Sequence, residues 1–406
     1  MTRITKGRNV AIVGAGPAGL FAAEMIAGAG NCVTIYERMP SPARKFLLAG
    51  RGGLNLTNSE PLPSFLARFD DDARELRAAV NAFPPEQLVA WADALGAAMF
   101  VGTSGRVFPR AMKASPLLRA WLRRLDGLGI TIKTRHRWTG FTPSGGLRFE
   151  TREGEAIVDS DAALLALGGA SWPKLGSDGK WVDIFEAEGI PFNALAPANC
   201  GVRIAWSEIF LSRFESVALK RVAISVGAAK ARGEAIVTRS GLEGGVVYAL
   251  VPHIRAELLA RGEAALMIDL KPDADPADLA RRLSRPRGGD TITNFLRKAL
   301  HLDAAAIGLL RETEIPEGTA ALAARVKAVP LRINGLAGLD RAISTAGGVA
   351  WSGLDQNQMI LARPGVFVAG EMLDFEAPTG GYLLQGTFAT AARAATGILT
   401  WLRTRE

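Results

Sequence analysis

A chain of 406 residues is too long for one compact core, so two or three domains are expected. The sequence has no run of 18 or more apolar residues, which argues against a membrane-spanning helix. Its two cysteines form no C-x-x-C pair and its three histidines lie far apart, so neither a redox-active dithiol nor a metal site is expected. The segment before the first strand is short and basic and leaves no room for a signal peptide, so we expect a cytoplasmic protein.

The net charge of +8 allows two interpretations. Basic runs at residues 119–137 and 281–287 could bind a nucleic acid or another acidic partner. They could equally be solvated helix faces in an arginine-rich protein. No RNA-binding motif with interleaved aromatic residues accompanies the charge, so the second interpretation is preferred and no nucleic-acid partner is expected.

The first motif of the chain is a glycine-rich turn between a strand and a helix. Residues 10–13 form a short apolar run that is typical of a buried parallel strand. Gly14, Gly16 and Gly19 follow at the G-x-G-x-x-G spacing. The first makes the tight turn, the second lets the backbone approach a pyrophosphate, and the third lets the helix lie close to the strand. Pro17 starts the helix, whose free N–H groups attract phosphate.

A second strand, residues 32–36, ends in an acid. Glu37 stands 23 residues after Gly14, where a carboxylate can accept hydrogen bonds from a ribose. An acid rather than an arginine at this place argues against a ribose 2′-phosphate. Strand, helix, second strand and acid in this order predict a dinucleotide-binding βαβ unit.

The segment after Glu37 is rich in glycine. Gly50, Gly52 and Gly53 make its backbone permissive, whereas a simple NAD-binding unit would turn quickly into a helix. We therefore expect an extended loop in contact with a longer cofactor, with Asn55 among its polar partners. A flexible surface loop is the alternative.

Two further segments are placed to meet the same cofactor. A strand at residues 136–141 would cross beside the adenine, which makes the backbone of Trp138 a candidate contact. The next buried strand, residues 162–167, ends in Gly168 and Gly169. The carboxyl end of a parallel strand is where a doubly wound sheet meets its ligand.

The pattern changes after residue 191. Short strands separated by turn residues come first, and helical segments follow. We interpret residues 192–332 as an inserted region, part β-barrel-like and part helical, that forms a substrate or cap region. Residues 1–191 and 333–406 would then form one discontinuous cofactor-binding domain.

The C-terminal part of the chain returns to the first domain. A buried strand ends in Gly370 and Glu371, which would meet the ribityl–pyrophosphate part of the cofactor. Gly380 and Gly381 then precede a helix of small residues that is expected to begin near residue 386 and to direct its N-terminus at a flavin ring. A cofactor that needs both ends of the chain fits FAD better than NAD.

These segments resemble the aminoacetone-oxidase-like FAD-binding family, also called the YhiN-type flavoproteins, within the glutathione-reductase-like FAD fold. The motifs T-A-G-G-V at residues 345–349 and T-G-G-Y-L-L-Q at residues 379–385 are the most specific to that family. The resemblance implies an α/β, Rossmann-like FAD-binding domain built from both ends of the chain, with an inserted β-barrel-like and helical region. Two motifs depart from the family. Residues 51–55 read R-G-G-L-N instead of G-G-R-C-N, and residues 242–245 read L-E-G-G instead of L-S-G-P, so the substrate stays open among amines, ketones and enones.

The predicted function is that of an FAD-dependent oxidoreductase that transfers a hydride to or from flavin N5 and acts on an unidentified small molecule. A flavoprotein that acts on RNA and a non-enzymatic flavin-binding protein are the alternatives. No second G-x-G-x-x-G follows a strand, so the electron donor or acceptor stays open. Arg51 and Tyr382 are the candidate catalytic residues. The residues expected to contact FAD are Gly14, Gly16, Pro17, Ala18, Gly19, Glu37, Arg38, Lys45, Gly52, Gly53, Asn55, Trp138, Gly168, Gly169, Gly370, Glu371, Gly380, Gly381 and Tyr382.

Overall fold

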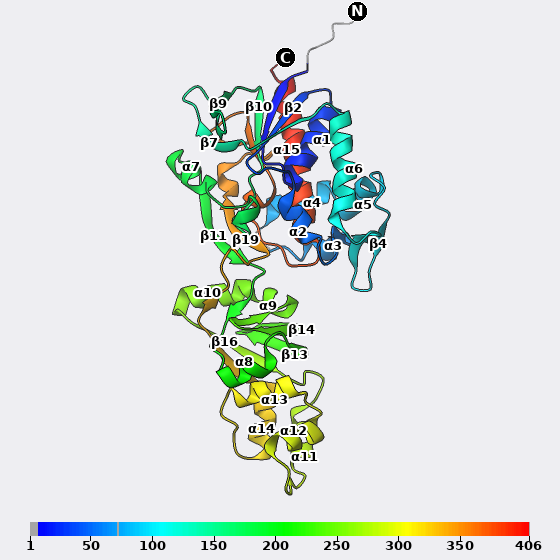
Figure 1. The fold of residues 1–406 in the computed structure, drawn as a ribbon, viewed down its shortest axis with the longest axis vertical. Helices are drawn as coiled ribbons and strands as arrows, with labels where there is room; N and C mark the ends of the chain where they lie inside the picture. The colour runs from blue at the N-terminus through cyan, green and yellow to red at the C-terminus, as the bar shows by residue number, and fades with distance from the viewer. Residues whose placement is uncertain (1–6, 71–72, 406) are drawn as a thin grey trace, which may run out of the picture. The chain divides into compact units, whose positions relative to one another are not determined.

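The computed structural model of the protein describes residues 7–70 and 73–405. The chain divides into two compact units (Figure 1). The first consists of Met1–Ala196 and Ser344–Glu406, and the second is Pro197–Ile343. The first unit therefore joins the two ends of the chain, and the guanidinium of Arg8 donates a hydrogen bond to the carbonyl oxygen of Arg405 at 2.8 Å.

A five-stranded parallel sheet is the centre of the first unit. Its order is β20 (Val366–Val368), β10 (Ala162–Leu165), β1 (Asn9–Val13), β2 (Cys32–Glu37) and β6 (Thr131–Thr134). Successive side chains of a strand point to opposite faces, and β1 shows this: Val10 and Ile12 join one hydrophobic cluster, whereas Ala11 and Val13 join another. Burial on both faces explains why these strands are unbroken apolar runs.

Helices cover one face of this sheet and a small antiparallel sheet covers the other. Figure 1 shows the helical side with α1 (Pro17–Gly28), α6 (Ala114–Gly127) and α15 (Tyr382–Arg403), whose apolar side chains share a cluster with Val10 and Ile12. The opposite face carries β7 (Arg137–Phe141), β8 (Leu147–Thr151), β9 (Gly154–Val158) and the helix α7 (Trp181–Ala187). The parallel sheet is thus covered on both faces, by helices on one side and by the antiparallel sheet with α7 on the other.

Smaller elements complete the first unit. Three short strands pair in the order β3 (Thr57–Asn58), β5 (Arg106–Pro109) and β4 (Met99–Val101), and two more pair as β11 (Phe192–Ala198) with β19 (Ser344–Val349). The remaining helical segments are α2 (Arg44–Ala49), α3 (Leu62–Leu66), α4 (Arg74–Ala82), α5 (Pro85–Asp93), η1 (Pro173–Leu175), η2 (Trp351–Gly353) and η3 (Gly370–Met372).

Two expectations about local structure were wrong. The glycine-rich segment after β2 is not extended throughout, because α2 forms within it and buries Phe46 beside Trp121, with the ring centroids 6.4 Å apart. The last helix begins at Tyr382 rather than near residue 386. Gly381, with φ of +100°, ends the preceding turn in a left-handed conformation and lets the helix start directly after it.

The second unit has its own sheet and core. Its seven strands lie in the order β17 (Val329–Ile333), β16 (Ala264–Asp269), β13 (Ala218–Val226), β14 (Ala229–Thr238), β15 (Gly241–Glu243), β12 (Val202–Arg203) and β18 (Gly335–Leu336). The helices are α8 (Glu208–Phe214), α9 (Gly245–Tyr248), α10 (Val251–Arg261), α11 (Pro276–Leu283), α12 (Ile292–Leu300), α13 (Ala304–Arg311) and α14 (Thr319–Lys327). Across the ranges described in both units, no helix combines the length and the apolar character that a membrane crossing requires.

Candidate cofactor-binding site

The residues predicted to hold the cofactor gather at one edge of the parallel sheet. Because β1, β2, β10 and β20 run in the same direction, their carboxyl ends meet at that edge. Gly14, Glu37, Gly168 and Gly370 each stand at, or shortly after, the end of one of these strands. The structure therefore brings together segments that the sequence separates by more than 300 residues.

The three glycines of the first turn have different surroundings. Gly14 has φ of +106°, and a Cβ there would stand 2.3 Å from the carbonyl oxygen of Ala166. A Cβ on Gly19 would stand 2.0 Å from the carbonyl oxygen of Gly14. These two glycines are therefore required by the packing of the protein itself. Gly16 borders open space, with nothing within 4 Å of its missing Cβ, beside the N-terminus of the 12-residue helix α1.

Glu37 is buried at the end of β2. One carboxylate oxygen accepts a hydrogen bond from the N–H of Ala15 at 2.9 Å, and the other accepts one from Met39 at 2.7 Å. Burial raises the pKa of this carboxyl, whereas those two N–H donors and the charges of Arg38 and Arg44 oppose the rise. Each oxygen can accept a second hydrogen bond, so a ribose hydroxyl can be added without breaking the first set.

A loop that follows β10 lies against the same carboxylate. Arg38, directly after Glu37, forms an ion pair with Asp178. A Cβ on Gly176 would be 3.9 Å from an oxygen of Glu37. The hydroxyl of Ser177 is buried and has no hydrogen-bond partner among the residues that the structure describes. The loop thus places an unused polar atom beside the position expected for the ribose.

A buried polar network links four segments at this edge. The ammonium of Lys45 contacts the hydroxyl of Ser171 and the carboxylate of Glu371. The other oxygen of Glu371 accepts from the N–H of Thr345 at 3.2 Å. The hydroxyl oxygen of Thr345 accepts from the N–H groups of Ala170 at 2.8 Å and of Ser171 at 3.1 Å. Sequence reasoning named Lys45 and Glu371 but missed Thr345 and Ser171, although Thr345 opens the T-A-G-G-V motif.

Two predicted glycines are explained by this packing. A Cβ on Gly169 would lie 2.4 Å from the Thr345 hydroxyl oxygen. A Cβ on Gly370 would lie 2.7 Å from the Cβ of Ala18, in the first turn of α1. The N–H of Gly370 also donates to the Thr390 hydroxyl of α15 at 3.1 Å. Gly169 lets the loop after β10 lie close to Thr345, and Gly370 lets the end of β20 lie close to the first turn of α1.

The loop from Arg51 to Asn55 has an open side. Nothing lies within 4 Å of a Cβ on Gly52, whereas a Cβ on Gly53 would be 2.9 Å from the methyl group of Met112. Arg51 is exposed and forms no ion pair with any residue in the described ranges. The side-chain oxygen of Asn55 is buried and has no hydrogen-bond partner in the protein.

The start of α15 differs from the expectation. Gly380 and Gly381 were expected to precede a helix that directs its N-terminus at a flavin ring, and this contact with the flavin stays a prediction. A Cβ on Gly381 would stand 2.5 Å from the carbonyl carbon of Thr57, and one on Gly380 would stand 2.9 Å from the ring of Tyr382. These glycines are needed for the contact of α15 with β3 and for the turn itself.

Tyr382 is a buried residue with a defined partner. Its ring packs on Phe65, with the centroids 4.6 Å apart, and its hydroxyl donates a hydrogen bond to Glu60. Glu60 forms an ion pair with Arg68 at 3.0 Å. Burial, followed by the contact with Glu60, raises the pKa of Tyr382 to about 12. The hydrogen bond from Arg68 is the largest cause of the lowered pKa of Glu60.

The geometry of this edge fits a long polar cofactor. Open space borders Gly16 and Gly52. Several buried polar atoms find no hydrogen-bond partner among the described residues, and they include the Asn55 oxygen, the Ser177 hydroxyl and the indole N–H of Trp138. FAD, with phosphates, two sugar-type chains and two ring systems, offers groups for such atoms. The contacts of individual residues with FAD remain predictions.

Residues 8–397 match the family described as the HI0933-like protein Rossmann domain. The chain belongs to the HI0933-like family. The predicted resemblance, the α/β fold class and the FAD cofactor are thereby confirmed. This HI0933-like chain is an FAD-dependent oxidoreductase.

Curated relatives that align with nearly the whole of this HI0933-like chain include proteins with two kinds of name. The 3-dehydro-bile acid delta(4,6)-reductase of Clostridium scindens is 25% identical over 414 residues, covering 95% of this chain and 98% of the relative. The ribosomal RNA dihydrouridine synthase of Escherichia coli is 24% identical over 411 residues, covering 96% and 97%. Among solved structures, Mycobacterium smegmatis Sdh1 in complex with UQ1 matches with a TM-score of 0.51 and 15% identity, covering 98% of this chain and 69% of that one. This last similarity concerns the fold alone.

Proposed function

We propose that this protein reduces a carbon–carbon double bond that is conjugated to a carbonyl group. The observation that carries the proposal is the pair of relatives that align with nearly the whole chain. A delta(4,6)-reductase of a 3-dehydro-bile acid and a dihydrouridine synthase are named for substrates of different size. Both names describe the saturation of a ring double bond in conjugation with a carbonyl group, which narrows the open choice among amines, ketones and enones.

Saturation of such a bond adds a hydride to the carbon β to the carbonyl and a proton to the α carbon. FAD supplies the hydride chemistry when it is bound. The protein has to orient the substrate, withdraw electron density from the double bond and supply the proton.

Tyr382 is the candidate source of the proton. Its pKa of about 12 keeps the phenol protonated at neutral pH. Glu60 accepts its hydrogen bond, and the lowered pKa of Glu60 keeps that carboxylate ionised. This hydrogen bond gives the phenol one defined orientation, but its proton points at Glu60. Tyr382 can therefore pass the proton to a substrate only when that hydrogen bond breaks, and its raised pKa makes it a weak acid.

Arg51 is the candidate partner of the carbonyl oxygen. Its guanidinium is exposed on the glycine-rich loop and forms no ion pair with a described residue. A hydrogen bond from this cation to the carbonyl oxygen would withdraw electrons from the conjugated double bond. The oxygen would also be held at a fixed distance from the loop.

The test is an anaerobic reoxidation experiment. The purified flavoprotein is reduced with one equivalent of dithionite and then mixed with a 3-oxo-Δ4 steroid or with a uridine-containing RNA. We expect the absorbance of oxidised flavin to return with one of these substrates, together with a product that has gained two hydrogens. A steroid with the same double bond but no carbonyl group is the matched control and should leave the flavin reduced.

An opposite result would overturn the proposal. If no conjugated carbonyl compound reoxidises the flavin, while aminoacetone or another amine reduces the oxidised protein, the chain is an amine oxidase and not a reductase of double bonds.

A further inference from the structure

The positive charge of this protein is concentrated in one segment. Residues 99–140 contain nine Lys and Arg residues and one Asp, a net charge of +8, which equals the net charge of the whole chain. All other residues together are therefore neutral.

The structure sorts these cations into paired and unpaired groups. Arg124 forms an ion pair with Glu24 at 2.9 Å, and Arg137 pairs with Glu150. Five others are exposed and form no ion pair with any residue of the described ranges. We call these five the basic face: Arg106, Arg110, Lys113, Arg119 and Arg123.

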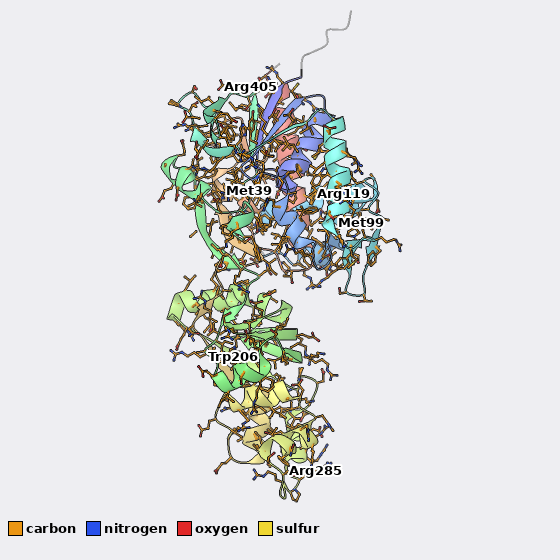
Figure 2. All side chains as sticks on the ribbon, in the orientation of Figure 1. Met39, Met99, Arg119, Trp206, Arg285 and Arg405 are labelled. Carbon is orange, nitrogen blue, oxygen red and sulfur yellow. The ribbon has the colours of Figure 1, made fainter. Side chains whose placement is uncertain are left out.

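A backbone hydrogen bond holds the β5 end of the basic face in place. The N–H of Arg110 donates to the carbonyl oxygen of Ala97 at 3.2 Å, close to the start of β4. Lys113 occupies the N-cap position of α6 without a capping hydrogen bond from its side chain. The helix buries Leu118 and Trp121 on the side opposite to Arg119 and Arg123. Figure 2 labels Arg119 on α6 and Met99 on β4 at the same flank of the first unit. Residues 99–125 contain no acid at all, so no carboxylate within this segment neutralises the face.

The basic face also carries a pair of aromatic rings. Phe100 and Phe108 are opposite each other in the β4–β5 hairpin, half-buried, with ring centroids 6.0 Å apart. Phe108 approaches the glycine-rich loop, since a Cβ on Gly53 would lie 3.5 Å from its ring. Cations that bind phosphates next to rings that stack on bases are the combination that single-stranded nucleic acids require.

We propose that the basic face binds a single-stranded segment of RNA. Four of its five cations are arginines, whose planar guanidinium groups bind phosphate oxygens in pairs. Bound there, the RNA would lie beside the loop from Arg51 to Asn55, which is predicted to contact FAD. The substrate of the proposed reduction would then be a base within the RNA, so this inference rests on the proposed function for its purpose. RNA binding itself is a separate property that can be measured without turnover.

The test measures binding by the flavin-loaded protein. Fluorescence anisotropy of a labelled single-stranded RNA is followed over a range of salt concentrations for the parent and for the double variant Arg119→Gln/Arg123→Gln. Removing two phosphate contacts should weaken binding about ten-fold at low salt and reduce the slope of log K against log salt by about 1 to 2.

Arg285→Gln/Arg287→Gln is the matched control, because it removes two exposed arginines of the α11–α12 loop that form no ion pair with a described residue. Figure 2 labels Arg285 in the second unit. Its RNA affinity should equal that of the parent. Flavin content and circular dichroism establish that each variant is folded.

Three results would overturn the proposal. The first is that the parent does not bind RNA. The second is that both double variants lose the same affinity. The third is that phosphatidylglycerol vesicles, but not RNA, bind the parent through Arg119 and Arg123. If the protein reduces small enones but does not bind RNA, the proposed function is retained and only the proposal that the basic face binds RNA is wrong.

Discussion

The three glycines of the first turn have different roles. Gly14 and Gly19 meet backbone atoms of the protein, whereas Gly16 meets nothing within 4 Å. The sequence motif treats the three as one unit, but only the second borders space that a ligand can fill. The substitution of Gly16 can therefore separate cofactor binding from folding.

We predict that Gly16→Val abolishes retention of FAD and leaves the protein folded, because the added methyl groups enter the space expected for the pyrophosphate. Gly28→Val is the matched control, since Gly28 also has nothing within 4 Å of its missing Cβ and lies at the other end of α1. The measurement is the flavin absorbance per protein after purification. Full flavin content in Gly16→Val would show that the pyrophosphate lies elsewhere.

Tyr382 allows a second prediction at this scale, based on pH. Its pKa is raised from 10.0 to about 12 in the folded protein, so folding favours the protonated phenol. The resulting stabilisation is complete below pH 10 and is lost as the pH rises from 10 towards 12. The free energy of unfolding should therefore fall more steeply over this range in the parent than in Tyr382→Phe. Urea unfolding at a series of pH values measures it, and equal slopes would mean that the phenol is not held as the structure indicates.

At the scale of elements, the polar network around Thr345 joins β19, η3, α2 and the loop after β10. Thr345 is 1% exposed, and its hydroxyl accepts from two backbone N–H groups. The loop after β10 would otherwise have two buried N–H donors without this acceptor. The network therefore fixes the loops between which the cofactor is predicted to lie.

We predict that Thr345→Val destabilises the first unit by about 1–3 kcal/mol, because the shape is kept while two buried N–H groups lose their acceptor. Thr345→Ser keeps the hydroxyl and should recover most of the stability. Urea unfolding gives the free energies, and flavin content shows whether the loops still hold FAD. A valine variant as stable as the serine variant would argue against the network.

The sequence predicted the elements that are determined by neighbouring residues. It did not predict those that depend on contacts with residues far away in the chain. The strand before Gly14 and the helix after it follow from apolar runs and glycine spacing. The helix α2 depends on the burial of Phe46 against Trp121, which lies 75 residues later. The partners of Thr345 lie 174 and 175 residues away, so no local pattern could have shown them.

At the scale of the whole molecule, two separate cores serve two parts of the chain. Ile12 is fully buried in the first unit, two residues before Gly14, and Leu266 is fully buried in the second. The discontinuous first unit could be foreseen because both ends of the chain carry glycine-rich strand ends. The direction in which the side chains of α6 point was not predicted. The basic face can be recognised only in the structure, where Arg119 and Arg123 lie on the side of α6 opposite to its buried residues.

The two cores lead to a last prediction about where FAD is held. Ile12→Ala and Leu266→Ala each remove a fully buried aliphatic side chain, and each should cost about 2–5 kcal/mol within its own unit. Hydrogen exchange read by mass spectrometry should increase within residues 7–196 and 344–405 for the first variant and within residues 197–343 for the second. Because the predicted FAD contacts all belong to the first unit, Ile12→Ala should lose flavin and Leu266→Ala should keep it. If Leu266→Ala loses as much flavin as Ile12→Ala, the second unit is needed to retain FAD, and the assignment of the cofactor to the first unit alone is wrong.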